Sequence, residues 1–381
     1  MSRHRPVGVV FALAFVLAMA SPVSAITFAA PIDLGTWGPT AAWPGSLKVG
    51  ADGTLHAVFA EGVADRVVVE YRRSSDDGRT WSAPYRLAGP YGEGTQPAIS
   101  VVGTSVDVAW ADGVSVYYRR SADGGRTWQK RKSIAFDNAG VALPQVARGA
   151  NGRVYVSYGS ASGVGIVMSE DGGLTFAAPK LLSGGGIQPQ PVLALSGSRV
   201  HVAYLEETGG AGQEGLVRVR SSVDSGSSWG TARTLTTRGD RVRPSIAAIG
   251  ASVVVAFGVL TTSGDQYVVS RKSTDIGVTW AAATAISSAS LTPSAGPVLA
   301  YAGGTWYAAV ERCATNACLS TATVLTQSTT ANSWPATTRV STSSSVFALP
   351  EAIARTATRT HVLYTGFDAD DSPTAFVRSG Q

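Results

Sequence analysis

The stretch Ser74-Ser75-Asp76-Asp77-Gly78-Arg79-Thr80-Trp81 decides the fold, because its pattern returns at regular intervals along the chain. The pattern S-x-D-x-G-x-[ST]-[WF] recurs at 121–128, 169–176, 222–229 and 273–280, with steps of 47, 48, 53 and 51 residues between the closing aromatic residues. A sixth copy ends at Trp334 and has Thr329 and Ala331 in place of the Asp and the Gly. A period near fifty residues predicts a repeat architecture in which each repeat is one supersecondary unit.

A second periodic feature, a series of prolines, gives the number of repeats. Seven prolines stand 47 or 53 residues apart, and each opens an apolar run that is followed by a Gly-rich or polar turn. The alternating runs that come next, such as 106–110 and 154–158, are typical of β-strands. Four short strands in each of seven repeats predict an all-β protein, a seven-bladed β-propeller of four-stranded antiparallel blades, with six blades as the alternative. The seven residues are Pro44, Pro97, Pro144, Pro191, Pro244, Pro297 and Pro350.

The two ends of the chain complement each other. The seventh repeat stops at 376–381, where its Asp motif would begin, and residues 27–31 repeat the letters of residues 175–179. We therefore expect the N-terminal segment to supply the outer strand of the last blade, because an open ring would leave unpaired strand edges. Residues 26–381 then form a single propeller domain, with about 51 residues for each blade.

Residues 1–25 have the pattern of a secretory signal peptide. Positive charge at 3–5 precedes an apolar run at 7–20, and small residues at 23–25 offer a cleavage site. The run of about 14 residues is shorter than the roughly 20 that a membrane-spanning helix needs. We therefore expect a secreted, extracellular protein with no membrane span after signal cleavage; an uncleaved anchor is the alternative.

Composition narrows the class of protein and of partner. Charged residues make up 15% of the chain, against about 25% in a typical globular protein. This excludes a disordered chain or a coiled coil. Because no basic cluster with interleaved aromatic residues occurs, we expect no nucleic acid partner. Export places Cys313 and Cys318 in an oxidising environment, which predicts a disulfide between them.

The histidines predict no metal site. His56, His201 and His361 lie at equivalent positions of three different repeats, which a propeller separates around its ring. We therefore expect no bound metal and no cofactor.

The Asp of the repeated motif suits a structural role. It lies at a turn between two strands, where its carboxylate can accept hydrogen bonds from backbone N–H groups nearby. Catalysis needs a carboxylate once or twice, whereas this one occurs five times in equivalent places. The five residues are Asp76, Asp123, Asp171, Asp224 and Asp275.

The ligand site is expected on one face of the ring. The loops before each inner strand and those between the second and third strands share that face. Their side chains differ between repeats while the β framework stays constant, as expected of a site carried by a scaffold. An ordinary solvated loop surface is the alternative for each of them. The candidates are Trp43, Glu61, Asp65, Gln96, Gln190, Glu206, Arg241, Arg243, Glu311 and Glu351.

These motifs resemble the Asp-box, or BNR-repeat, propellers of the sialidase (neuraminidase) superfamily. The resemblance covers the repeats of residues 26–381 and is densest at 43–84. It implies three converging Arg for the sialic acid carboxylate, a Tyr nucleophile paired with a Glu, and an Asp as acid/base. The first Arg of that set normally opens an Arg-Ile-Pro motif, and this chain has Ala-Trp-Pro at 42–44. Only Asp65 lies near a position of the catalytic set, that of the acid/base Asp.

The missing Arg favours a binding protein over an enzyme. We expect a secreted, monomeric, non-catalytic propeller that binds a glycan or an extracellular or envelope protein. The alternative is an exo-sialidase or another glycoside hydrolase that acts at the central mouth of the ring. That alternative requires two carboxylates about 5–10 Å apart. The residues that could form such a pair are Glu61, Asp65, Glu206, Glu311 and Glu351.

Overall fold

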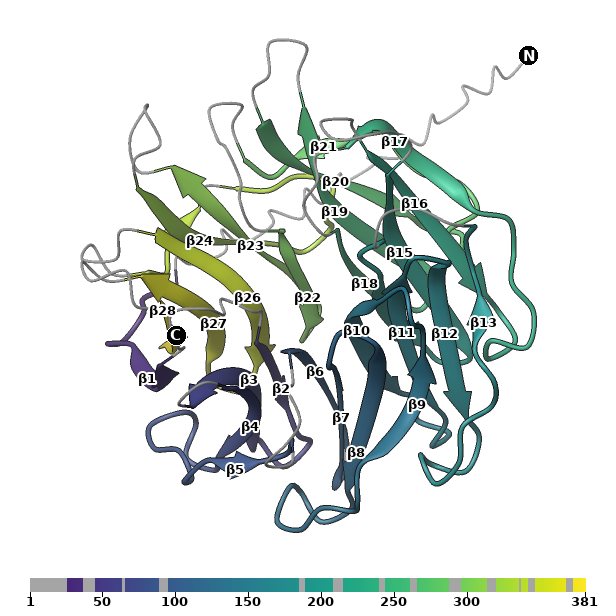
Figure 1. Ribbon diagram of the computed structural model, residues 1–381. Helices are drawn as coiled ribbons and strands as arrows, with labels where there is room; N and C mark the ends of the chain where they lie inside the picture. The colour runs from purple at the N-terminus through teal and green to yellow at the C-terminus, as the bar shows by residue number, and fades with distance from the viewer. Residues whose placement is uncertain are drawn as a thin grey trace, which may run out of the picture.

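The computed structural model describes residues 26–36, 45–63, 66–88, 95–184, 189–207, 215–239, 244–260, 266–287, 296–313, 320–335, 337–341, 347–367 and 373–381. All regular elements in these ranges are β-strands, arranged as four-stranded antiparallel blades around one axis (Figure 1). The seven-bladed propeller is confirmed, and the six-bladed alternative is wrong. In the same ranges, no helix is long and apolar enough to cross a membrane.

The first four blades each run from an inner to an outer strand in chain order. Their strands are β2 (Ser46–Val49), β3 (Leu55–Val63), β4 (Arg66–Ser74) and β5 (Tyr85–Arg86) in blade 1; β6 (Thr95–Val102), β7 (Ser105–Ala111), β8 (Ser115–Ser121) and β9 (Lys132–Phe136) in blade 2; β10 (Val141–Arg148), β11 (Val154–Ser160), β12 (Gly163–Ser169) and β13 (Lys180–Leu181) in blade 3; and β14 (Val192–Ser196), β15 (Arg199–Glu207), β16 (Gly215–Ser222) and β17 (Arg233–Gly239) in blade 4.

The last three blades complete the ring, and a single bridge between Gly239 and Val259 links blade 4 to blade 5. Their strands are β18 (Ser245–Ile249), β19 (Ser252–Leu260), β20 (Gln266–Ser273) and β21 (Thr284–Ala285) in blade 5; β22 (Val298–Ala302), β23 (Thr305–Cys313), β24 (Thr321–Ser328) and β25 (Thr338–Arg339) in blade 6; and β26 (Phe347–Arg355), β27 (Thr360–Phe367), β28 (Pro373–Gly380) and β1 (Ile32–Thr36) in blade 7.

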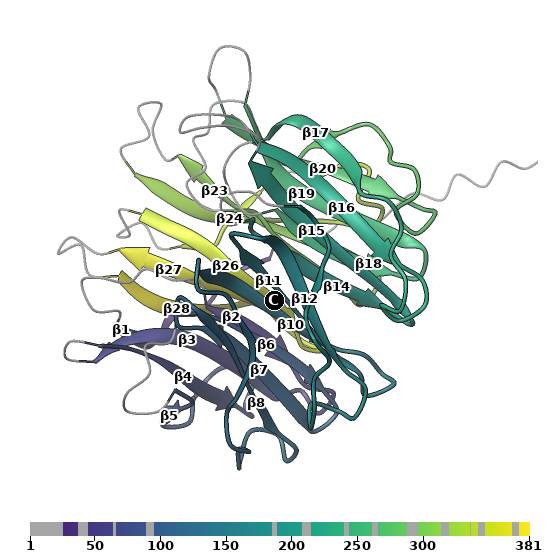
Figure 2. The same cartoon turned by 45° about the vertical axis from the view of Figure 1, so that its right-hand side comes forward.

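The N-terminal segment closes the ring as the repeat pattern predicts. Strand β1 pairs antiparallel with β28, with Ile32 opposite Val377 and Thr36 opposite Thr374. Both views show β1 beside β28 (Figures 1 and 2). Each inner strand contacts the inner strands of the two neighbouring blades, including β2 with β26. The first and last segments of the described chain therefore belong to one sheet, and the ring has no open edge between blades 7 and 1.

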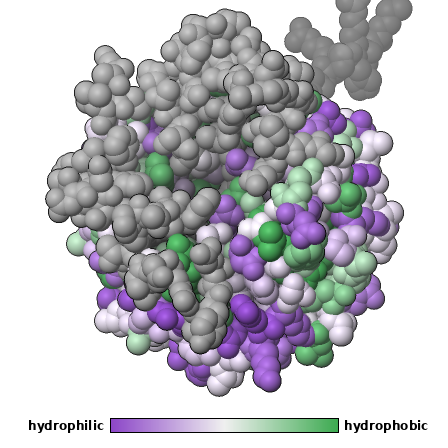
Figure 3. All heavy atoms as spheres, in the orientation of Figure 1, coloured by the Kyte–Doolittle hydropathy of each residue, from purple (hydrophilic) through white to green (hydrophobic). Residues whose placement is uncertain are grey.

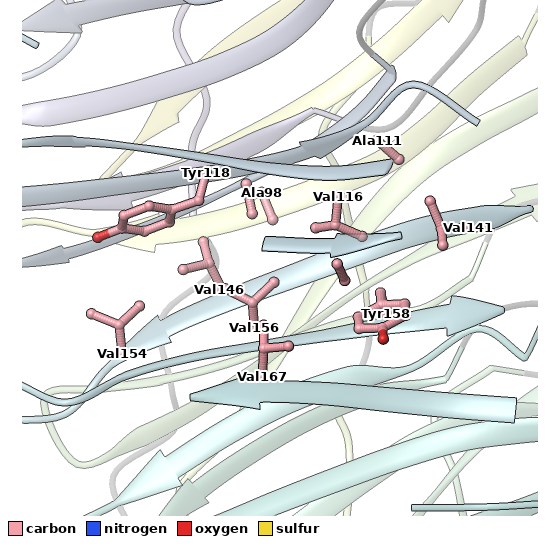
Figure 4. Packing of buried hydrophobic residues seen from close by; sticks show 12 residues of the cluster. Ala98, Ala111, Val116, Tyr118, Val141, Val146, Val154, Val156, Tyr158 and Val167 are labelled. Atoms are coloured by element: carbon pink, nitrogen blue, oxygen red, sulfur yellow. The ribbon is translucent and has the colours of Figure 1, made fainter. Parts of the chain in front are cut away.

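The hydrophobic core lies between the blades. Successive residues of a strand point to opposite faces of its sheet, so each blade presents an apolar face to both of its neighbours. Between blades 2 and 3, Val116 and Tyr118 meet Val146, Val156 and Val167 (Figure 4). Every residue of β11 is buried, because this strand lies in the middle of its blade and is covered on both sides.

The repeated Asp motif forms a closed hydrogen-bonded turn. In blade 1 the Ser74 hydroxyl donates to Oδ1 of Asp76 at 2.7 Å and accepts from the backbone N–H of Gly78 at 3.0 Å. The backbone N–H and the hydroxyl of Thr80 donate to the two Asp76 oxygens at 2.9 and 2.6 Å. The turns at Asp123, Asp171, Asp224 and Asp275 repeat these bonds.

The aromatic residue that ends the motif joins neighbouring blades. Trp128 of blade 2 meets Tyr71 of blade 1 edge to face, with ring centroids 5.0 Å apart. Phe176 of blade 3 meets Tyr118 of blade 2 in the same way at 4.8 Å. Close to the first contact, a Cβ on Gly125 would lie 1.9 Å from the Tyr71 hydroxyl oxygen, and the φ of Gly125 is +78°. This glycine is therefore required both by its conformation and by the approach of the neighbouring blade.

Leu34 provides a test of the ring closure. It is fully buried in the cluster that contains Phe59 of blade 1 and Leu363 of blade 7. We expect Leu34→Ala to lower the free energy of unfolding by about 3 kcal/mol, because it removes buried methyl groups and leaves a cavity. Urea unfolding measures this effect. The control is Leu181→Ala on β13, the corresponding outer strand of blade 3, where the leucine is 52% exposed and the expected change is below about 0.5 kcal/mol. Equal losses in the two variants would contradict the closure.

Candidate functional site

The candidate residues that the structure describes are distributed around the ring, in five of its blades. Glu61 belongs to blade 1, Gln96 to blade 2, Glu206 to blade 4, Glu311 to blade 6 and Glu351 to blade 7. Gln190 precedes β14 of blade 4. Four further candidates lie outside the described residues: Trp43, Asp65, Arg241 and Arg243.

The start of the inner strands in blades 2 and 3 forms one structured site, which we call the blade 2–3 rim and define by Gln96, Leu143 and Gln145. Gln96 and Leu143 directly precede the repeat prolines and have positive φ values of 57° and 50°. Oε1 of Gln96, a residue that is 8% exposed, accepts a hydrogen bond from the backbone N–H of Leu143 at 2.5 Å. Both strands are irregular here, because their pairing registers shift between Thr95 and Ala98 and between Ala142 and Gln145.

The rim leaves one donor and one acceptor for a ligand. Nε2 of Gln145 donates to the Pro144 carbonyl at 3.0 Å, which fixes its amide group. Among the described residues, Nε2 of Gln96 and Oε1 of Gln145 have no protein partner. A non-glycine residue with positive φ costs roughly 1–2 kcal/mol. Strain of this kind persists where the surroundings enforce it and is concentrated at binding sites.

Blade 1 holds a pair of carboxyl groups that the sequence did not reveal. Glu61 on β3 lies next to Glu70 on β4, which is 4% exposed and forms an ion pair with Arg86 at 3.5 Å. Burial raises the pKa of Glu61 to about 7, and a hydrogen bond with Glu70 and the negative charge of Glu70 contribute further. Glu61 can therefore hold a proton near neutral pH. The signal for Glu70 was a single acidic residue within the apolar run 67–71.

The remaining described candidates have partners or positions that differ from one another. Oε2 of Glu206 forms an ion pair with Nε of Arg218 at 2.7 Å, within blade 4. The Thr365 hydroxyl donates to Oε1 of Glu351 at 2.9 Å, within blade 7. Glu311 is 1% exposed and is therefore inaccessible at the surface. Glu206 and Glu351 thus each make a contact within their own blade.

The structure describes one of the two cysteines of the predicted disulfide. Cys313 is disulfide-bonded, and Cys318 lies outside the described residues.

The three histidines occupy buried positions in separate blades. Nδ1 of His56 contacts the Tyr71 hydroxyl at 2.6 Å, and Nδ1 of His201 contacts the Ser221 hydroxyl at 2.8 Å. His361 contacts Ser379 through Nδ1 and Asp77 of blade 1 through Nε2, at 2.8 and 3.1 Å. In the part of the chain that the structure describes, no group of three His, Cys, Asp or Glu residues could hold a metal ion.

In blade 2, the strand position that the histidines occupy in their blades is taken by Asp107, and this residue links blade 2 to blade 3. Asp107 is fully buried and binds the guanidinium of Arg148 in blade 3 through two contacts of 2.6 Å. The Tyr118 hydroxyl donates to the same carboxylate. The sequence shows each of these residues but not their meeting, because 41 residues separate Asp107 from Arg148.

Comparison with protein families gives a match over half of the chain. Residues 42–240 match the BNR repeat-like domain. No curated protein matches the chain in sequence.

Several solved structures share the fold. A protein of unknown function from Dyadobacter fermentans is 13% identical with a TM-score of 0.55, over 94% of this chain and 100% of that one. The phage phi92 endosialidase is 11% identical with a TM-score of 0.55, over 93% of this chain and 68% of that one. An α-L-arabinanase of Penicillium chrysogenum, solved with arabinobiose, is 12% identical with a TM-score of 0.52, over 93% and 98% of the two chains. At identities this low, the likeness establishes the shared fold alone.

Proposed function

This chain belongs to the BNR repeat-like domain family, within the sialidase superfamily of β-propellers, and from that premise we propose that it is a secreted, non-catalytic propeller that binds a glycan. The ligand binds the loop-bearing face, and the blade 2–3 rim makes the central contact. Two solved structures that share the fold are named for their action on carbohydrates, the endosialidase and the arabinanase, and this is the reason to test glycans before other ligands.

The observation that carries the proposal is the strained pair Gln96 and Leu143. Two adjacent blades hold positive φ values at the same repeat position, and the Gln96 side chain bridges them. The bridge uses the oxygen of the Gln96 amide and leaves its NH2 group to donate to a ligand. Neutral amide donors and acceptors fixed in place are suited to sugar hydroxyl and acetamido groups, which present donors and acceptors themselves. The described surface in Figure 3 mixes hydrophilic and hydrophobic groups, which also suits a partly polar ligand.

A substitution at Gln96 tests the proposal. We expect Gln96→Glu to weaken the binding of a glycan selected on an array about fivefold or more. Glutamate keeps the oxygen that accepts from Leu143 but loses the donor, and one hydrogen bond contributes about 1 kcal/mol. Calorimetric titration of the purified chain with that glycan measures the change, and thermal unfolding verifies that the variant is folded.

The matched control is Gln129→Glu, which makes the same chemical change at an exposed position beside Arg120, at the end of blade 2 opposite the rim. The glycan affinity of this control is expected to stay within a factor of about two, since Gln129 does not belong to the blade 2–3 rim. Equal losses of glycan affinity in the two variants would show that the added negative charge, and not the missing Gln96 donor, weakens binding. A purified, folded chain that retains no glycan on the array contradicts the proposal.

Glycoside hydrolysis is the second candidate, and the carboxyl pair in blade 1 favours it. A protonated Glu61 beside Glu70 has the chemistry of a general acid next to a second carboxyl group. The same preparation assayed with aryl glycosides decides between the two functions. Turnover that Glu61→Gln abolishes and Glu170→Gln, at an exposed position, leaves intact would replace the binding proposal with a hydrolase.

A further inference from the structure

The central channel is lined by several positively charged side chains, which are separate from the proposed glycan site. A cavity of about 360 Å³ lies on the axis and is lined by the ends of all seven inner strands. Its charged lining residues are Lys48 of β2, Arg148 of β10 and Arg355 of β26, and among the described residues no Asp or Glu belongs to the lining. These strand ends lie away from the blade 2–3 rim, which is formed by the opposite ends of the inner strands.

The three cations differ in their partners. Asp107 neutralises Arg148 through two contacts of 2.6 Å, so that this guanidinium is committed to the interface between blades 2 and 3. In the described parts of the chain, neither Lys48 nor Arg355 forms an ion pair or a hydrogen bond through its side chain. The channel therefore carries two positive charges that the described protein groups do not balance. An uncompensated charge in a partly desolvated site is unfavourable and is relieved by a bound counter-ion.

The repeat explains why the channel has room for an ion at Lys48. Strand pairing places Lys48 opposite His56, and the residue at the same register is small in every other blade. A long side chain from one blade thus projects into a ring of short ones. The corresponding residues are Ser100, Ala147, Ala194, Ala247, Ala300 and Ala354.

The environment of Lys48 favours an anion beside it. Its side chain is solvent-exposed and lines the channel, and partial desolvation by the surrounding protein lowers the pKa of Lys48. A neighbouring anion has the opposite effect, because it stabilises the charged ammonium. The adjacent blade supplies Arg355 as a second cation, and β2 contacts β26 directly.

We propose that the central channel is a binding site for a small oxyanion, which Lys48 and Arg355 hold at the end of the inner strands. The chemical class is an inorganic oxyanion of the size of phosphate or sulfate, or the carboxylate of a small organic acid. A cavity of about 360 Å³ is large enough for such a ligand together with several waters.

Calorimetric titration with sodium phosphate, sodium sulfate and sodium acetate at constant ionic strength tests this proposal on the full chain. We expect one binding site per chain for at least one of the three anions, and a rise in Tm when that anion is added. Lys48→Met and Arg355→Met are each expected to weaken binding about tenfold or more, because each removes a charge-assisted contact to the anion. Methionine keeps most of the length and removes the charge, and Lys48→Arg is expected to retain binding.

The control variant is Lys130→Met, which removes an exposed lysine outside the channel and is expected to bind as the unmodified chain does. Unchanged affinity in both Lys48→Met and Arg355→Met would overturn the proposal. So would the absence of binding by all three anions at concentrations up to about 50 mM, which is sufficient to detect millimolar affinity. Gln96→Glu is expected to bind the anion normally, so that failure of the glycan proposal and failure of this one can be told apart.

Discussion

Asp107→Ala is expected to lower the free energy of unfolding by about 3–5 kcal/mol, the usual cost of removing one partner from a buried ion pair. Asp107 is fully buried and Arg148 is 8% exposed, and the Tyr118 hydroxyl also donates to the carboxylate. Without Asp107, the Arg148 guanidinium retains only its bonds to the carbonyl oxygens of Gly152 and Gly172, at 2.9 and 3.0 Å. Its positive charge is then buried without a counter-ion. Urea unfolding of the variant measures the loss.

The double variant Asp107→Leu/Arg148→Met separates the ion pair from the packing around it. Removing both charges leaves no unpaired ion, so we expect this variant to be more stable than Asp107→Ala. A single-variant loss below about 1 kcal/mol would contradict the role of Asp107 as a link between blades 2 and 3. In that case the apolar contacts of the same interface, shown in Figure 4, would hold the two blades together without it.

A fall in pH from about 7.5 to about 4 is expected to destabilise the protein by about 3–6 kcal/mol. Burial lowers the pKa of His56 and of His201 to about 4, from the usual 6.5. Between these pKa values the two histidines are protonated in the unfolded chain and neutral in the folded chain. The stability that they contribute is therefore fully present above pH 6.5 and falls toward pH 4. Each unit of pKa difference corresponds to about 1.4 kcal/mol, so the two histidines together contribute about 7 kcal/mol at most. His361 adds less, because Asp77 stabilises its charged form and offsets part of the lowering of its pKa by burial.

Glu61 acts in the opposite direction over part of the same range. Its pKa is raised to about 7, so the folded chain binds a proton there that the unfolded chain releases above about pH 4.5. Stability from this group is present at low pH and is lost as the pH rises through 7. Because Glu61 is only partly buried, solvent screening reduces its effect, and the histidines dominate.

Thermal unfolding between about pH 4 and pH 7.5 tests this balance. The double variant His56→Gln/His201→Gln is expected to lose most of the pH dependence in this range. The carboxylates of the Asp motif are a reference for the pH dependence that does not come from the histidines. Hydrogen bonds from Ser, Thr and backbone groups lower the pKa of Asp224 and Asp275 to about 2. Their contribution is present above about pH 4 and is lost only as the pH falls toward 2, in both the variant and the parent chain. An unchanged pH dependence above about pH 4 in the double variant would contradict the role of the histidines.

The candidate site could be predicted from the sequence only in part. The repeat prolines locate the starts of the inner strands, and Gln96 is therefore among the candidates that the repeat pattern indicates. Its bond to Leu143 of the next blade, and the positive φ of both residues, depend on how two strands with irregular pairing meet. Glu70 was missed because strand alternation predicts which residues face a neighbouring blade, not which charged groups lie beside them.

The sequence by itself determined the number of blades, the strand order within each blade and the joining of the N-terminal segment to the last blade. These features follow from local hydrogen-bonding and burial patterns that repeat about every fifty residues, so each repeat provides the same information again. Only the tertiary structure decided that Asp107 meets Arg148 and that Lys48 projects into a channel lined with alanines. The physical reason is that contacts between blades depend on the rotation of one sheet against the next and on side-chain conformations. Neither quantity is encoded in the periodicity of a single strand.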